Sequence, residues 1–183
     1  MLAFSRTYPF RGRGSYFRQG LVEDAPTTIR GMIASLVAAL AIAVTPAPPA
    51  LVATAGVPVR CVADGAWTTQ FPSYVASAMG VYDTQGGVIY LRGVMCDRLE
   101  LLAGGARPTS VRSQYDFASA VFLLAHEMMH AQGIASDAAA DCAAGQRFLS
   151  VAGSLGVGPG YAATLADYLV NARIPLRCYP DEG

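Results

Sequence analysis

The feature that most constrains the fold is a long apolar segment that holds three ionisable side chains. Residues 118–125 read ASAVFLLA, and the motif HEMMH follows directly with His126, Glu127 and His130. A helix that is apolar on nearly all sides is buried, and buried ionisable groups are costly unless a compensating charge lies beside them. The chain has two histidines, and both stand in this motif. The fold must therefore enclose this helix and satisfy its three polar side chains.

Helix geometry places the two imidazoles on one face. Residues i and i+4 lie one turn apart, so His126 and His130 can direct ring nitrogens at a single point. Glu127 is displaced by about 100° around the helix axis, where it can hold a water at that point without binding a metal itself. HExxH is a zinc motif in which two neutral imidazoles bind the ion and the glutamate is the general base. The alternative is a pair of hydrogen-bonded core histidines.

HEMMH on an apolar helix resembles the zincin metallopeptidases. The stretch DAAADCAAGQRF, residues 137–148, is similar to the glutamate-helix pattern of gluzincins. The segment with Gly133, Asp137 and Cys142 also resembles small exported actinobacterial proteins that carry HExxH and have no assigned activity. This resemblance is specific over residues 121–148. It implies a minimal α+β zincin-like domain, in which a short β-sheet and the HExxH helix pack on further helices, and it implies a peptide or protein substrate.

The sequence departs from two known zincin patterns, which limits the families that it can resemble. The metzincin frame HExxHxxGxxH holds up to Gly133, but its third-ligand position is Ser136, and no methionine follows Met129. A metzincin assignment therefore fails. Compared with thermolysin-like enzymes, the acid after the motif is an aspartate, and it comes only seven residues after His130. The resemblance therefore implies a short connection between the motif helix and the helix that follows it.

The third metal ligand must come from outside the histidines. The candidates after the motif are Asp137, Asp141, Cys142, Asp167, Cys178, Asp181 and Glu182. Gly133 can end the motif helix in a left-handed conformation, and Ser136 is a good N-cap for a new helix. Asp137 then faces back toward the histidines, and Asp141, one turn later, can accept the free N–H of a ligating imidazole. Alternatively, Asp137 only complements the helix N-terminus, or the two aspartates exchange roles.

The other elements follow from local patterns over residues 56–183. Residues 57–62 and 86–93 are predicted strands, because β-branched and aromatic residues alternate there between turn residues. Helices are predicted near residues 96–105, 115–132, 137–152 and 161–172. The strand GVIYLR is either the sheet edge that binds an extended peptide or an ordinary core strand. Candidates for an oxyanion donor are Tyr161, Tyr168, Arg173 and Tyr179.

The N-terminal third differs in composition. Residues 1–31 are rich in arginine and glycine without a periodic apolar pattern, which predicts disorder. Residues 32–55 contain an apolar core that is too short to span a membrane and fits a signal peptide, with small-x-small cleavage sites at 41–43 and 53–55. The alternatives are a membrane anchor retained through residues 32–53 and a buried core helix. We therefore expect a protein that is secreted or anchored to the outer face of the cell membrane.

The cysteines agree with export. Cys61, Cys96, Cys142 and Cys178 are even in number and too widely spaced for a CxxC site. We predict two disulfides in an oxidising compartment, Cys61 with Cys96 and Cys142 with Cys178. The alternative is four reduced, buried cysteines. The formal charge of zero gives no electrostatic footprint for nucleic acid.

Two functions remain. The first is an exported zinc-dependent metallopeptidase that hydrolyses peptide bonds through a zinc-bound water, with Glu127 as general base. The second is a non-catalytic domain that zinc stabilises for binding at the cell envelope. Glu127 favours the first, because a structural zinc site needs no carboxylate beside its ligands.

Overall fold

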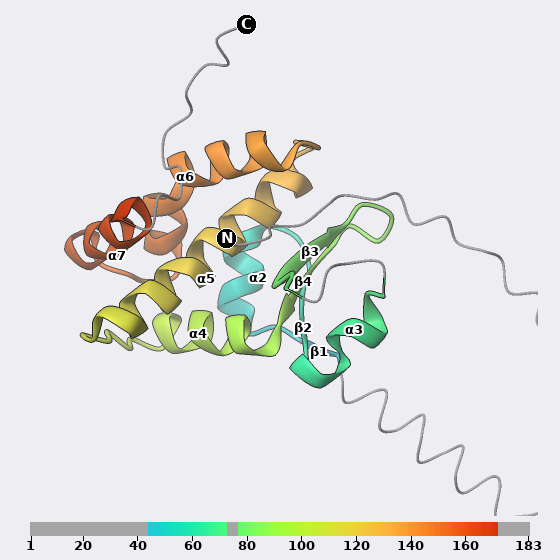
Figure 1. Cartoon of the computed structure of the whole chain (residues 1–183), viewed down its shortest axis with the longest axis horizontal. Coiled ribbons are helices and arrows are strands. Elements are labelled where there is room, and N and C mark those ends of the chain that lie inside the picture. The colour runs from blue at the N-terminus through green and yellow to red at the C-terminus, as the bar shows by residue number, and fades with distance from the viewer. Residues whose placement is uncertain (1–43, 73–76, 172–183) are drawn as a thin grey trace, which may run out of the picture.

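The computed structural model describes residues 44–72 and 77–171, which form an α+β domain, as predicted (Figure 1). Its elements are β1 (Val44–Pro46), α2 (Pro49–Ala55), β2 (Val59–Val62), the 3-10 helix η1 (Asp64–Ala66), α3 (Trp67–Gln70), β3 (Gly80–Asp83), β4 (Val88–Arg92), α4 (Gly93–Ala103), α5 (Val111–Ala131), α6 (Asp137–Ser154) and α7 (Pro159–Asn171). The helices predicted around the motif are therefore present, with ends shifted by a few residues. Strand β3 and the short helices before it were not predicted.

The sheet is small and mixed, with the strand order β1-β2-β4-β3. β2 and β4 are parallel, whereas β1 and β3 pair antiparallel to their neighbours. β4, which carries GVIYLR, therefore lies between β2 and β3. It is a core strand, and the edge nearest the motif helix is β3.

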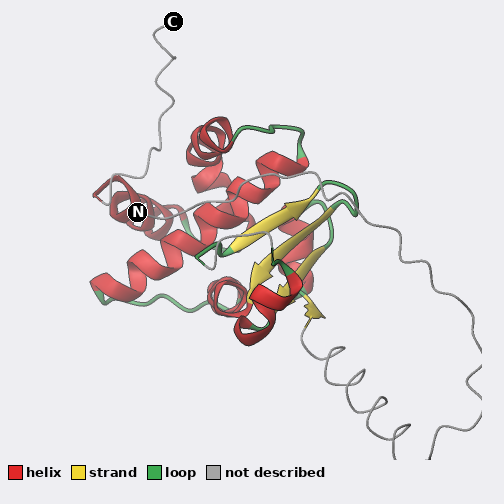
Figure 2. Cartoon of the chain, turned by 45° about the vertical axis from the view of Figure 1, so that its right-hand side comes forward, coloured by secondary structure: helices red, strands yellow, loops and turns green. Residues whose placement is uncertain are grey.

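Helix α5 is the centre of the domain. It begins one turn earlier than predicted, because the side chain of Ser110 caps it by accepting the N–H of Ser113 at 3.2 Å. It contacts β3 and β4 on one side and α6 and α7 on the other, as Figure 2 shows. Its middle is buried throughout from Phe117 to Ala125. The HEMMH motif thus begins inside the core, between the sheet and the last two helices.

The folded part of the chain starts earlier than expected. Residues 44–55, which we predicted to belong to a signal peptide or anchor, form β1 and α2. β1 pairs with β2 in the register of Val44 with Val62, and Leu51 of α2 is 0% exposed against the core. The domain boundary that we placed at residue 56 is thus corrected to residue 44 or earlier. Residues 32–43 and the predicted disordered segment 1–31 lie outside the described residues.

The first predicted disulfide is confirmed. Cys61 and Cys96 are bonded, which joins β2 to α4 across a sequence separation of 35 residues. Cys142 on α6 is also disulfide-bonded, whereas Cys178 lies outside the described residues. None of the helices within 44–72 and 77–171 has the length and hydropathy that crossing a membrane requires.

Candidate metal centre

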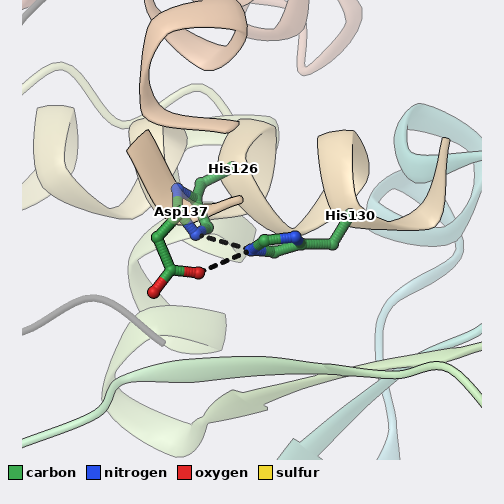
Figure 3. A group of neighbouring side chains, drawn as sticks. All are labelled: His126, His130 and Asp137. Carbon is green, nitrogen blue, oxygen red and sulfur yellow. Dashed lines mark hydrogen bonds and ion pairs between the residues drawn. The ribbon is translucent and has the colours of Figure 1, made fainter. Parts of the chain in front are cut away.

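The two motif histidines lie one turn apart on α5 and face the same point. His126 is 0% exposed and His130 is 4% exposed, and their ring centroids are 4.7 Å apart. Their Nε2 atoms face each other at 3.0 Å. Figure 3 shows both rings directed away from the helix axis toward the Asp137 carboxylate. The i,i+4 spacing on a straight helix is sufficient to produce this arrangement.

A short turn after α5 returns the chain to this point. Gly133 adopts a φ of 95°, and the N–H of Ile134 donates to the carbonyl of Met129 at 3.1 Å, which closes the helix end. Ser136 then caps α6 by accepting the N–H of Ala139 at 3.5 Å. Local capping signals therefore place residue 137 in the first turn of a helix that faces the histidines.

Asp137 lies where the sequence predicts a third ligand. Its Oδ1 is 3.4 Å from Nε2 of His130. His126, His130 and Asp137 each offer one ligand atom, and these atoms all lie within 4.8 Å of one another. Two imidazole nitrogens and one carboxylate oxygen in this arrangement could hold a metal ion.

Hydrogen bonds fix the orientation of both rings. Nδ1 of His126 donates to Oδ1 of Asp141 at 2.7 Å, and Nδ1 of His130 donates to the carbonyl of Ile134 at 2.6 Å. A carbonyl oxygen, and the Asp141 carboxylate when ionised, can only accept, so each Nδ1 carries its proton and each Nε2 is left with a lone pair when the ring is neutral. Asp141 thus occupies the orienting position predicted for it. The Ile134 carbonyl is a partner that the sequence did not reveal.

The two histidines differ in proton affinity. Burial lowers the pKa of His126, but the hydrogen bond to Asp141 and the charge of Glu127 outweigh it, so this pKa lies above the usual 6.5. Burial also lowers the pKa of His130, and there the bond to the Ile134 carbonyl does not compensate. The environment of His126 thus favours its protonated form, and that of His130 disfavours it.

Glu127 is as fully buried as His126. It is 0% exposed, and neither carboxylate oxygen has a hydrogen-bond partner. Burial raises its pKa from 4.5 to about 7, although His126 opposes this rise. The main-chain N–H of Tyr82 on β3 lies close enough to lower this pKa slightly, but not in the geometry of a full hydrogen bond. The carboxylate therefore lies between α5 and β3 without a hydrogen bond of full geometry.

The two aspartates are more exposed than the two histidines of the site. The side chains of Asp137 and Asp141 are 32% and 23% exposed, whereas those of His126 and His130 are 0% and 1% exposed. Among the described residues of the site, the solvent-exposed part therefore lies at the start of α6.

Other candidates from the sequence are not part of this group. Cys142 is disulfide-bonded, and Asp167 lies exposed on α7. The hydroxyl of Tyr161 donates a hydrogen bond to the carbonyl of Pro108 at 2.6 Å, which links α7 to the loop before α5. Tyr168 also lies on α7. The remaining candidates, Arg173, Cys178, Tyr179, Asp181 and Glu182, lie outside the described residues.

The sequence analysis missed the contribution of β3. The run GVYDTQGGVIY at residues 80–90 contains two β-rich segments around a glycine-containing turn, which is a hairpin signal. This signal would have placed β3 beside β4.

No known family model matches the chain, and no curated protein or solved structure is significantly similar to it.

Proposed function

We propose that the domain is an exported zinc-dependent metallopeptidase. The observation that carries this proposal is the convergence of two Nε2 atoms and one carboxylate oxygen beside a buried glutamate that has no hydrogen-bond partner. Three ligands with a fourth position left open are typical of catalytic zinc sites. His126, His130 and Asp137 would hold the ion.

Two of the three separations between ligand atoms are close to those of a zinc site. Ligand atoms about 2.0 to 2.1 Å from a tetrahedral zinc ion lie about 3.3 to 3.4 Å apart. The Nε2 atoms are 3.0 Å apart, His130 and Asp137 are separated by 3.4 Å, and all three ligand atoms lie within 4.8 Å of one another. Movements of the side chains would bring the three atoms to equal separations. A cation here would also replace the proton that the facing nitrogens otherwise need.

Glu127 supports catalysis over a purely structural role for the metal. A bound zinc ion acidifies water and polarises a carbonyl. Glu127, which follows the ligand His126 in the chain, is not in the ligand group, so its carboxylate could act as the general base toward a metal-bound water. Its carboxylate would take the proton of the attacking water and pass it to the leaving amine.

Strand β3 supports a peptide as substrate. Among the described residues, β3 pairs with β4 along one side only. The N–H of Arg92 donates to the carbonyl of Met79 at 2.9 Å, so alternate residues from Met79 onward direct their main-chain groups toward β4. Those of Gly80 and Tyr82 point the other way. An extended peptide could add to this edge by main-chain hydrogen bonds, close to Glu127.

Export is supported by the disulfides and by the N-terminal sequence. Structural disulfides form and persist in oxidising compartments, and Cys61, Cys96 and Cys142 are all oxidised. The apolar stretch before β1 fits a signal peptide that ends before residue 44. Of the two cleavage sites, the one at 53–55 would remove β1 and α2 from the fold, so processing at 41–43 is the consistent choice.

The burial of the centre favours the second candidate, a non-catalytic zinc-stabilised domain for binding at the cell envelope. His126 and Glu127 are both 0% exposed. A substrate carbonyl can reach them only if the start of α6 or the edge of β3 moves. If no such movement occurs, zinc would only join α5 to α6.

Metal binding is tested first. The purified protein is dialysed against zinc, and the bound metal is measured for the wild type, His126→Ala, Asp137→Ala and the exposed control Asp167→Ala. We expect close to one zinc per chain in the wild type and the control, and almost none in the two ligand variants. Full retention in His126→Ala would reject the site. If Asp137→Ala retains its zinc and Asp141→Ala loses it, Asp141 is the ligand and Asp137 is not.

Catalysis is tested with Glu127→Gln. Fluorescein-labelled casein is the probe, and the exposed Glu100→Gln is the matched control. We expect Glu127→Gln to keep its zinc and to lose cleavage by at least about 100-fold, since general-base catalysis contributes about 10² to 10⁴. Zinc-loaded wild type without activity on casein or on a quenched peptide library would favour the non-catalytic domain.

A further inference from the structure

Gly80 lies at the start of β3, beside the candidate metal centre. This glycine is buried, and it is not one of the five described glycines with positive φ. Its backbone conformation is therefore open to any residue. A glycine inside a strand weakens the strand and often marks a close approach of another group. The group that occupies the space next to Gly80 can be identified from the atoms that a Cβ at this position would meet.

A Cβ at position 80 would meet three side-chain atoms. It would lie 3.1 Å from Oε1 of Glu127, 3.1 Å from Cδ2 of Leu91 and 3.2 Å from Cδ1 of Leu123. Carbon atoms in ordinary contact are about 3.5 to 4.0 Å apart. All three neighbours would have to withdraw, and the two leucine atoms are the ends of flexible side chains.

The Glu127 carboxylate is likewise the end of a flexible side chain. Neither oxygen of Glu127 has a hydrogen-bond partner, so its position depends on packing between α5 and β3. The metal-ligand group consists of His126, His130 and Asp137, and none of its atoms is among the three nearest to position 80. A side chain at this position would thus displace the carboxylate and leave the ligands where they are.

We propose that Gly80 is a positioning residue, whose missing side chain creates the space in which the Glu127 carboxylate lies against β3. Its catalytic consequence rests on the proposed function, in which Glu127 is the general base. The contact itself does not. Contacts of 3.1 to 3.2 Å are relieved by shifts smaller than about 1 Å, whereas a displacement of about 1 Å at a reacting group can lower the rate by about 100-fold. Gly80→Ala should therefore lower turnover by less than that and leave metal binding intact.

The kinetic test compares Gly80→Ala with Gly153→Ala, because a Cβ at the exposed Gly153 of α6 meets nothing within 4 Å. Zinc content, kcat and KM on labelled casein are measured for both. We expect Gly80→Ala to bind one zinc, to keep KM within about twofold and to lose kcat several-fold, up to about 100-fold. Gly153→Ala should match the wild type. An unchanged kcat in Gly80→Ala would overturn the proposal.

The contact is tested without activity through thermal stability. In the Glu127→Ala background one of the three crowding atoms is gone, so Gly80→Ala should lower Tm less than it does in the wild type. We expect the two Tm shifts to be non-additive by about 3 °C or more, as is typical for residues in contact. Additive shifts would overturn the proposal. This result also stands if the wild type does not cleave casein, in which case the proposed function fails alone.

If Gly80→Ala does not fold, a rescue experiment tests the proposal. Glu127→Ala and Leu123→Val each remove one of the crowding atoms. If Glu127→Ala restores a cooperative unfolding transition to Gly80→Ala and Leu123→Val does not, the carboxylate is the group that Gly80 accommodates. The reverse result would overturn the proposal.

Discussion

Replacing Glu127 by glutamine should make the metal-free protein more stable at pH 8 but not at pH 4. The folded protein holds the proton of Glu127 up to about pH 7, whereas the unfolded chain releases it near pH 4.5. Between these values the folded state binds more protons than the unfolded state, so the free energy of unfolding falls as the pH rises. The glutamine amide does not titrate and lacks this pH dependence.

The magnitude follows from the two pKa values. A tenfold change in proton affinity corresponds to about 1.4 kcal/mol. A pKa of about 7 in the folded state against 4.5 in the unfolded chain therefore destabilises the wild type by about 3 kcal/mol above pH 7. Since domains are stable by only about 5 to 15 kcal/mol, this is a large fraction of the total.

The assay is urea denaturation followed by circular dichroism, with chelator present and the disulfides intact. The wild type and Glu127→Gln are compared at pH 4 and pH 8, so the titration of most other groups cancels. We expect the difference in unfolding free energy to grow by about 3 kcal/mol between the two pH values in favour of the variant. A difference that is the same at both would refute the claim that the carboxylate is buried without a partner. Zinc should reduce the difference, because a nearby cation stabilises the charged carboxylate.

Three further predictions concern the fold and the site. Leu51→Ala should destabilise the protein by about 2 to 5 kcal/mol in urea, because this leucine is fully buried in the core; an effect as small as that of the exposed control Leu101→Ala would mean that α2 is not part of the domain. Replacing Cys61 and Cys96 together by serine should lower the unfolding free energy by about 3 to 4 kcal/mol, since the bond closes a loop of 35 residues, and unchanged stability would contradict this. Asp141→Ala should weaken zinc binding by about 10- to 100-fold in a competition titration, because it removes the acceptor 2.7 Å from His126; wild-type affinity would show that Asp141 does not orient the ring.

The part of the site that lies in one continuous stretch could be predicted from the sequence alone. The i,i+4 spacing of His126 and His130, the glycine at 133 and the cap at Ser136 are all local signals. Each depends on helix geometry or on the hydrogen bonds of a helix end, which neighbouring residues determine by themselves. They were enough to predict that Asp137 faces the histidines and that Asp141 follows one turn later.

Only the tertiary structure decided what surrounds this stretch. An apolar segment followed by prolines fits a leader peptide, and nothing local shows that Leu51 packs on the core, because burial depends on distant parts of the chain. Strand order is equally non-local: the pattern of GVIYLR is the same whether β4 lies at the edge or in the centre of the sheet. The contact between Gly80 and Glu127 joins the start of one strand to the C-terminal part of a later helix. A glycine in a strand does not indicate from sequence which group it accommodates. That group is identified only when the fold places the Glu127 carboxylate beside Gly80.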